Sequence, residues 1–276
     1  MTEDYTPELF SLVPDNSSDK KPGLCSSLVG FGQTEWQKNY SAGVDISKYQ
    51  KVTSWSEFEN SDNLSFLFIK ATEGVTIRNP FFPQHWKDSN YIATPNHPKM
   101  YRGAYHFYHP ADDPIEQADF FLSTIGELEI IDLPPVLDLE SFDKLKITDL
   151  KVKKTVAKNV LTWLRYVEQK THRTPILYTY RNFWITLGSI DPAFAHYPLF
   201  IASYNENLCP LAMAPWTNWT FWQYSESGTI SGIENHTDLD IFNGNENDLL
   251  NFIDSSKVPF QNEISGITSS LNEGPK

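Results

Sequence analysis

Short apolar runs alternate with helical patterns along the first two thirds of the chain. Runs at 43–46, 66–71, 101–108, 136–140 and 174–180 are brief and bounded by Gly, Pro or polar residues, which predicts strands. Helices are expected from residue 54, around 81–88, from 113 to 125, over 149–170, and up to residue 188. The longest carries Val152, Val156, Val160 and Leu164 on one face. Alternating strand and helix units indicate a parallel sheet.

The pattern changes after residue 188. Strands are expected at 199–204, 220–224 and 237–242, joined by loops rich in Pro, Asn and Gly that show no helical period. Five strand–helix units followed by three strands joined by loops give eight strands, enough to close a barrel. We therefore predict an α/β fold, an irregular TIM-like barrel that lacks its last helices.

The ends of the sequence differ in composition from the middle. Residues 1–40 are polar and aperiodic, so we expect a flexible N-terminal extension before a barrel domain at 41–254 and a polar tail at 255–276. The N-terminus lacks the basic start and apolar stretch of a standard signal peptide, and no apolar run reaches the length of a membrane span. The localisation therefore stays open.

Charge and cysteine content narrow the possible partners. The formal net charge of −13 argues against nucleic acid, anionic lipid and other polyanions, all of which bind to basic surfaces. Cys25 and Cys209 are the only cysteines, too few for a disulfide framework or a metal-ligand cluster, and whether they pair is left open. We expect no metal, no cofactor, no nucleic acid or membrane partner, and a monomer.

Two carboxylates mark the end of the fourth predicted strand. Asp138 and Glu140 are two residues apart, so on a strand both side chains point to the same face. Carboxylates at the end of an apolar strand are costly unless they are paired, hydrogen-bonded or used in chemistry. Taken alone, such a pair is more often two strand-end acids that face solvent or cap the next turn.

Further polar and aromatic residues lie at the ends of the other predicted strands. In a βα barrel, functional groups gather at the carboxyl ends of the strands. Taken alone, His106 is more typical of a histidine in the core. The aromatic residues, taken alone, are equally typical of packing within the barrel. Carboxylates recurring at equivalent strand ends are harder to explain by packing, and their crowding raises at least one pKa, which suits the acid and base roles of glycoside hydrolysis. The strand ends carry Asp45, Glu73, His106, Asp138, Glu140, Tyr178, Tyr204, Trp222, Gln223 and Asp238.

Eight sequence motifs follow one another at the spacing of a known family. Together they resemble the family 25 glycoside hydrolases, the muramidase-type lysozymes, over about residues 41 to 245. The family's fold, five strand–helix units plus three strands, agrees with the predicted elements. The motifs are Gly43-Val44-Asp45-Ile46-Ser47, Phe68-Ile69-Lys70-Ala71-Thr72-Glu73-Gly74, Gly103-Ala104-Tyr105-His106-Phe107, Asp138-Leu139-Glu140, Ile176-Leu177-Tyr178, Ile201-Ala202-Ser203-Tyr204, Phe221-Trp222-Gln223-Tyr224 and Asp238-Leu239-Asp240-Ile241-Phe242.

The resemblance implies roles for individual residues. Glu140 matches the general acid, and Asp138 the partner that orients the 2-acetamido group of the sugar. Asp240 stands where the family frequently has Asn, which leaves open whether Asp238 or Asp240 faces the cleft; the motif favours Asp238. The residues implied to bind substrate are Asp45, Tyr105, Tyr178, Tyr204, Trp222, Gln223 and Asp238.

The predicted function is hydrolysis of the β-1,4 bond between N-acetylmuramic acid and N-acetylglucosamine in bacterial peptidoglycan. One alternative is a chitinase-like hydrolase of N-acetylglucosamine polymers, which also uses an acid pair and an acetamido group. The longer Asp-x-x-Asp-x-Asp-x-Glu run of those enzymes is absent from this sequence. A second alternative is a barrel that binds glycan without cutting it, although a pure binder has no need of a crowded ring of acids.

Overall fold

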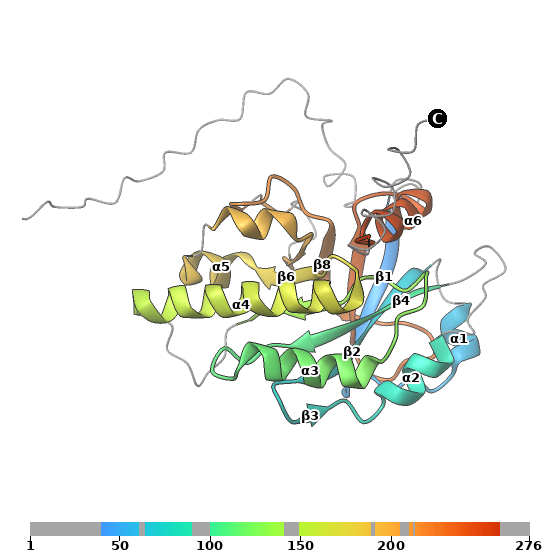
Figure 1. Ribbon diagram of the computed structural model, residues 1–276. Coiled ribbons are helices and arrows are strands. Elements are labelled where there is room, and N and C mark those ends of the chain that lie inside the picture. The colour runs from blue at the N-terminus through green and yellow to red at the C-terminus, as the bar shows by residue number, and fades with distance from the viewer. Residues whose placement is uncertain are drawn as a thin grey trace, which may run out of the picture.

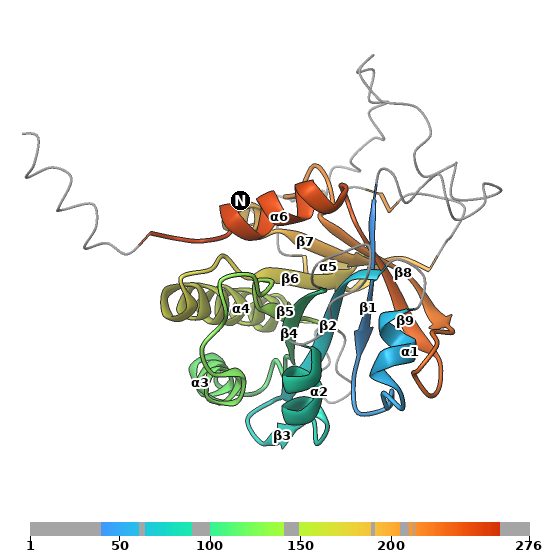
Figure 2. The same ribbon diagram turned by 90° about the vertical axis from the view of Figure 1, so that its right-hand side faces the viewer.

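The computed structural model describes residues 40–60, 64–89, 100–140, 149–188, 191–204, 210–211 and 213–259. Eight strands pair in a closed ring, because β1 hydrogen-bonds both β2 and β9 (Figures 1 and 2). The short strand β3 (Ile77–Arg78) pairs with β2 outside this ring. The strands of the ring are β1 (Ser41–Ile46), β2 (Leu64–Glu73), β4 (Tyr101–Phe107), β5 (Val136–Asp138), β6 (Ile176–Tyr180), β7 (Leu199–Ala202), β8 (Phe221–Gly228) and β9 (Thr237–Phe242).

Each of the first five ring strands is followed by a helix, as the sequence predicts. Ser54, Asp113 and Asp149 are the N-caps of three of these helices and accept hydrogen bonds from first-turn amides. The third helix ends at Gly126, which has a φ of 69° and so adopts a conformation that suits glycine. The predicted irregular α/β barrel is confirmed. The helices are α1 (Trp55–Glu59), α2 (Phe82–Ser89), α3 (Pro114–Ile125), α4 (Leu150–Thr171) and α5 (Arg181–Leu187).

The last strand departs from the predicted parallel sheet. β9 runs antiparallel to both β8 and β1, which makes the barrel mixed. The connection between β8 and β9 covers only residues 229–236, too short for the crossover that parallel neighbours need. Because β9 runs opposite to the other strands of the ring, its first residues lie at the barrel end where those strands finish.

Two helical segments after residue 188 were not expected from the sequence. One is a short 3-10 helix at Pro192–His196, and the other is α6 (Glu246–Ser255), which begins with a capping box at Asn245. Leu249 and Ile253 of α6 join the apolar cluster inside the barrel, so this helix closes the barrel floor. In the part of the chain that the structure describes, β7, β8 and β9 follow one another without an intervening helix, as predicted, and α6 is an addition after the last strand. Backbone contacts continue to Val258, whose amide donates to the carbonyl of His172 at 2.8 Å, within the tail expected to start at 255.

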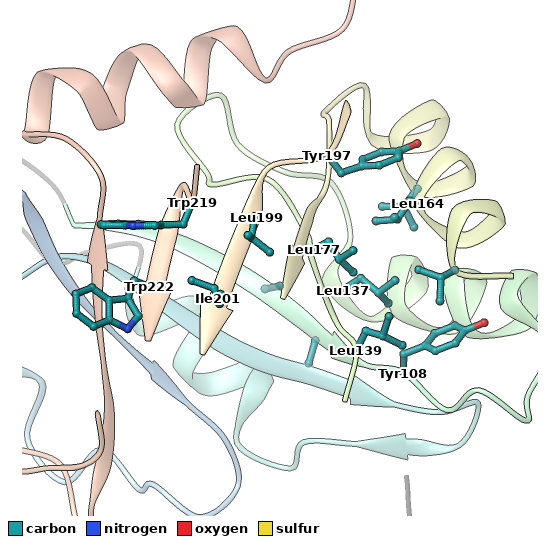
Figure 3. Close-up of a cluster of buried hydrophobic side chains, with 14 of the residues drawn as sticks. Tyr108, Leu137, Leu139, Leu164, Leu177, Tyr197, Leu199, Ile201, Trp219 and Trp222 are labelled. Carbon is teal, nitrogen blue, oxygen red and sulfur yellow. The ribbon is translucent and has the colours of Figure 1, made fainter. Parts of the chain in front are cut away.

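The strands separate two apolar cores by the alternation of their side chains. Phe66, Phe68, Phe200 and Phe221 point inward and fill the lower barrel. Their neighbours point outward and join a second cluster under the helices, which includes Leu137, Leu177, Leu199 and Ile201 together with Leu164 of α4 (Figure 3). Each such fully buried side chain contributes about 1.5–3 kcal/mol of burial free energy. The upper barrel, left free of this packing, holds the polar residues.

Several sequence predictions lie outside the described residues. These are the proposed flexible extension up to residue 39, the tail beyond 259, and both cysteines, Cys25 and Cys209. Within the described residues, none of the helices combines the length and apolar character needed to cross a membrane.

Candidate active site

A pocket of about 290 Å³ opens at the barrel end where the parallel strands finish. Eight of the nine residues named from the sequence line it, with Trp222 the exception. Ser47, Phe68, Lys70, Phe107, Val136, Phe200 and Glu226 complete the lining. The eight are Asp45, Tyr105, Asp138, Glu140, Tyr178, Tyr204, Gln223 and Asp238.

Strand register explains why distant residues meet in this pocket. Asp138 is the last residue of β5 and pairs across the sheet with Tyr178 of β6. Asp45 of β1 pairs with Asp238 of β9, and their side chains share the inner face. Neighbouring residues on one face of a sheet lie about 4.5–5.5 Å apart between Cβ atoms, so opposed acids are close neighbours.

Gln223 connects three of these residues by hydrogen bonds. Its Nε2 donates to Oδ2 of Asp45 at 2.6 Å. Its Oε1 accepts from the hydroxyl groups of Tyr178 and Tyr204, both at 2.8 Å. Gln223 itself is buried, so these bonds hold two phenols and a carboxylate in fixed positions.

The carboxyl groups of Asp138 and Glu140 both favour the protonated form. Burial is the main cause that raises the pKa of Asp138 well above its usual value, followed by the charge of Glu140. Burial also raises the pKa of Glu140, although its contact with the Tyr178 hydroxyl and the Lys70 charge act in the opposite direction. Since the two groups interact, they titrate as a pair that retains a proton above the usual carboxyl range.

The opposite wall of the pocket also carries carboxyl groups with raised pKa values. Burial, and then the charges of Glu226 and Glu140, raise the pKa of Asp238 to about 6. Burial, and then the charge of Asp238, raise the pKa of Asp45 well above its usual value. The pocket can therefore present both neutral and ionised carboxyl groups to a ligand near neutral pH, which acid–base chemistry requires.

Lys70 is a cation in the pocket that the sequence analysis did not single out. Its Nζ donates to Oε2 of Glu73 at 2.8 Å and lies 4.5 Å from the ring centre of Phe107. Its positive charge lowers the pKa of Asp45, Asp138 and Glu140, against the larger effect of burial. Alternation from the inward Phe68 along the same strand was the signal that could have placed Lys70 inside.

Trp222 does not line the pocket, contrary to expectation. It is fully buried in the outer core, where its ring centre lies 5.8 Å from that of Trp219 (Figure 3). Its Nε1 donates to the carbonyl of Ser203 at 2.8 Å. Adjacent residues of a strand face opposite sides, so Gln223 and Trp222 cannot both point inward.

Two other residues named at strand ends also lie outside the pocket. His106 is fully buried, with Nδ1 2.8 Å from the hydroxyl of Thr72 and Nε2 3.1 Å from Oε1 of Gln117. A bulge in β2 between Lys70 and Thr72 turns this threonine toward the histidine. Burial lowers the pKa of His106 to about 3, as expected of a neutral core residue. Glu73 forms an ion pair with Lys70, and its Oε1 lies 3.3 Å from Nε2 of His109.

Asp240 lies deeper in the barrel than Asp238. Its strand position is opposite Gly43 of β1 and Gln223 of β8, one inward step below the pocket. It is buried, and neither carboxyl oxygen has a hydrogen-bond partner. Burial, and then the charge of Asp45, raise its pKa well above the usual value. Of these two acids, only Asp238 lines the pocket.

None of the His, Cys, Asp and Glu side chains in the described ranges form a group of three or more suited to hold a metal ion. The polar groups that line the described pocket are carboxyl, phenol, hydroxyl, amide and ammonium groups.

Comparison with known proteins identifies relatives of the chain. Residues 44–233 match the model of Glycosyl hydrolases family 25. Lysozyme M1 of Streptomyces globisporus is 32% identical over 223 residues, 75% of this chain and 69% of the relative. The N,O-diacetylmuramidase of Chalaropsis sp is 30% identical over 201 residues, 70% of this chain and 92% of the relative.

A solved structure agrees with the sequence matches. The crystal structure of the bacterial lysozyme from Streptomyces coelicolor is similar to this chain with a TM-score of 0.69 and 26% sequence identity. The similarity covers 78% of this chain and 98% of that structure. With its family match, its barrel and its carboxylate-lined pocket, the chain belongs to glycosyl hydrolase family 25 and is a glycoside hydrolase.

Proposed function

We propose that the protein is a lysozyme that hydrolyses the β-1,4 bond between N-acetylmuramic acid and N-acetylglucosamine in peptidoglycan. The observation that carries this proposal is the pair formed by the buried Asp138 and the half-buried Glu140 in the pocket of a family 25 barrel. Burial raises the pKa of both carboxyl groups, so the pair holds a proton to a higher pH than exposed carboxyl groups do. The lysozyme and muramidase names of its relatives support the choice of substrate.

Glu140 is assigned as the general acid and Asp138 as its partner: the two coupled carboxyl groups share a proton, which this assignment places on Glu140 and which leaves Asp138 ionised. Glu140 is the less buried of the two, which suits a group that reaches the glycosidic oxygen. Asp138 lies deeper, and its Oδ1 has no hydrogen-bond partner. An unsatisfied buried oxygen is costly, so a substrate N–H that reached it would gain a strong bond.

The two carboxyl groups favour assistance by the substrate. They project from one strand end into the pocket rather than flanking it, whereas a nucleophile and an acid normally stand on opposite sides of the scissile bond. In the proposed first step, the acetamido oxygen of muramic acid attacks the anomeric carbon while Glu140 protonates the departing sugar oxygen. Asp138 stabilises the positive charge that develops on the acetamido nitrogen. Water then attacks the anomeric carbon, loses a proton to Glu140, and restores the acetamido group.

The remaining residues of the pocket are assigned to substrate binding. Tyr178 and Tyr204 are held by Gln223, while Asp45 and Asp238 form the far wall. Tyr105 lines the pocket beside Lys70, its partner across the β2–β4 pair. Phenol rings and carboxylates of this kind recognise sugars by stacking and by hydrogen bonds to hydroxyl groups.

The assignment of Glu140 is tested with Glu140→Gln, which keeps the shape but removes the proton. Clearing of purified cell walls should fall about 10²–10⁴-fold. Asp138→Asn should also be severely impaired, with some residual activity because an amide can still contact the acetamido group. Circular dichroism must show both variants folded. A folded Glu140→Gln protein that clears walls at more than a tenth of the normal rate would exclude Glu140 as the acid.

The substrate is tested in the same assay. Cleavage of chitin oligomers at the rate of cell walls would favour the chitinase-like alternative. Binding of walls without any release of reducing ends would favour a barrel that binds glycan without cutting it.

Substrate assistance predicts the stereochemistry of the product. Two successive attacks at the anomeric carbon give net retention, so proton NMR of the first-formed product should show the β-anomer. Glycan without the muramic N-acetyl group should be cut at a rate near zero. An initial α-anomer would contradict this mechanism while leaving Glu140 as the acid.

A further inference from the structure

Helix α4 carries a concentration of positive charge on a strongly anionic protein. Six of the 22 basic residues of the chain lie on this helix, whereas the formal net charge is −13. Glu168 is the only acidic residue among them within the helix. The basic residues are Lys151, Lys153, Lys154, Lys158, Arg165 and Lys170.

Four of these cations line a groove of about 480 Å³ between α4 and the end of α5. Lys154, Lys158 and Arg165 are exposed along it, and Lys153 also lines it. Ala157, Leu161 and Leu187 are buried and form its apolar floor. The groove thus combines an apolar floor with a cationic rim.

The positive charge of this groove is not neutralised within the described part of the chain. Neither Lys154 nor Lys158 forms an ion pair there, in contrast to Lys70 and Lys257. Asp191, the acid that lines the groove, already accepts a hydrogen bond from the amide of Ala193. A ligand with negative charge would therefore meet unpaired ammonium groups.

The groove begins at the same end of the barrel as the active-site pocket. α4 connects the parallel strands β5 and β6, so it must run back from the end where β5 finishes. Its first turn, at Leu150, therefore lies toward the pocket end, and Figure 1 shows β4 pointing toward that end of α4. A ligand that emerges from the pocket could extend toward the groove.

We infer that this groove binds the anionic peptide stem attached to the muramic acid of the substrate, an inference that rests on the proposed lysozyme function. Peptide stems carry alanine methyl groups and free carboxylates, which match an apolar floor with a cationic rim. A five-residue stem spans at most about 17 Å when extended. The helix covers about 16 Å between Lys154 and Arg165, at about 1.5 Å per residue.

The overall charge favours a short anionic ligand over a long one. A long polyanion would extend over the rest of a surface that carries a net charge of −13 and would be repelled. A stem peptide stays within the basic region and is tethered to the sugar in the pocket. Tethering raises its effective concentration, so weak contacts with lysine side chains contribute to binding.

The test uses the charge-reversal pair Lys154→Glu with Lys158→Glu in the full chain. The control pair, Lys87→Glu with Lys170→Glu, changes the net charge of the protein by the same amount as the test pair. Its two positions lie outside the groove, on α2 and at the far end of α4. Each protein is assayed on walls with intact stems, on walls whose stem carboxylates are amidated, and on glycan strands freed of stems by an amidase. The milder pair Lys154→Gln with Lys158→Gln removes the charge without adding a carboxylate.

The reversal should raise KM about fivefold to tenfold on intact walls and leave kcat unchanged. The control pair should keep the wild-type KM, and the Gln pair should fall between the two. All variants should match wild type on stem-free glycan, and amidated walls should reduce the effect. Equal losses in the reversal and control pairs, or a KM increase that persists on stem-free glycan, would overturn the stem-binding site. If wild type cleaves none of the three substrates, the proposed function itself fails.

Discussion

Two polar clusters of the same barrel surround their carboxylates with different partners. One is the active-site pocket, where Asp45, Asp138, Glu140 and Asp238 crowd together near a single lysine of the described lining. The other, here called the arginine cluster, consists of Arg102, Asp132, Glu129 and Arg173 near the start of β4.

Every charge of the arginine cluster has a partner. Arg102 donates from Nε to Oδ1 of Asp132 at 2.9 Å and stacks 4.0 Å from the ring centre of Trp86. The second oxygen of Asp132 accepts from the amide of Glu129 at 2.7 Å. Arg173 donates to the carbonyls of Asp132 and Glu129 at 2.9 and 2.7 Å. Buried charges satisfied in this way connect loops to strands and serve the fold.

The pocket offsets the burial of its acids only in part, through Gln223, Tyr178 and Lys70. Burial raises the pKa of each of its four acids, and mutual repulsion adds to the effect on Asp45, Asp138 and Asp238. Such an arrangement costs stability and supplies protons near neutral pH, as a catalytic site requires. Both clusters contain acids, but in the active-site pocket the partners of the carboxyl groups fail to offset the effect of burial on their pKa values.

The largest stability effect is expected from breaking the arginine cluster. Arg102→Met leaves Asp132 buried without its charged partner and should lower the free energy of unfolding by about 3–5 kcal/mol. Urea unfolding measures the loss, and kcat of the folded protein should be preserved. The control Lys257→Met removes an exposed pair with Asp254 and should cost less than about 1 kcal/mol. Equal losses of unfolding free energy in Arg102→Met and Lys257→Met would contradict the structural role of the arginine cluster.

A smaller effect of opposite sign is expected from Asp240→Asn. The folded protein holds the Asp240 proton more tightly than the unfolded chain, so this acid weakens stability progressively as pH rises above about 3.9. The amide has the same shape and does not ionise. Its stability gain should be near zero at pH 4 and should grow by at most about 1.4 kcal/mol per pH unit toward neutral pH. Urea unfolding at several pH values measures this slope, and a gain independent of pH would contradict a buried carboxylic acid.

Much of the barrel could be predicted because local patterns agree with it. Apolar runs locate the strands, and capping residues such as Asp113 and Asp149 mark where helices begin. The antiparallel β9 could not be read from its own residues, since strand direction depends on the length of the preceding connection. α6 was not predicted although Asn245 and Asp248 form a capping box. The Asn- and Gly-rich sequence at 243–247 is typical of a loop and continues the pattern of the preceding connections.

The alternation of side chains along each strand predicts which residues point into the site. Asp138 and Glu140 were placed together from their spacing alone, and both line the pocket. Trp222 was misplaced because an aromatic residue in a motif was taken for a sugar contact while its neighbour Gln223 already pointed inward. Alternation from Phe68 also predicts that Lys70 points inward, whereas its contacts with Glu73 and Phe107 arise only in the folded chain.

The central claim is that burial, offset only in part by its partners, keeps a catalytic proton on Glu140. The pH dependence of kcat/KM for wild type and Glu140→Gln tests this claim most directly. Burial raises the pKa of Glu140, so wild-type activity should decline on the alkaline side with an apparent pKa above the usual glutamate value of about 4.3. The residual activity of Glu140→Gln should lack this decline. A wild-type rate that still rises through pH 9, or a variant that keeps the same alkaline decline, would contradict the assignment.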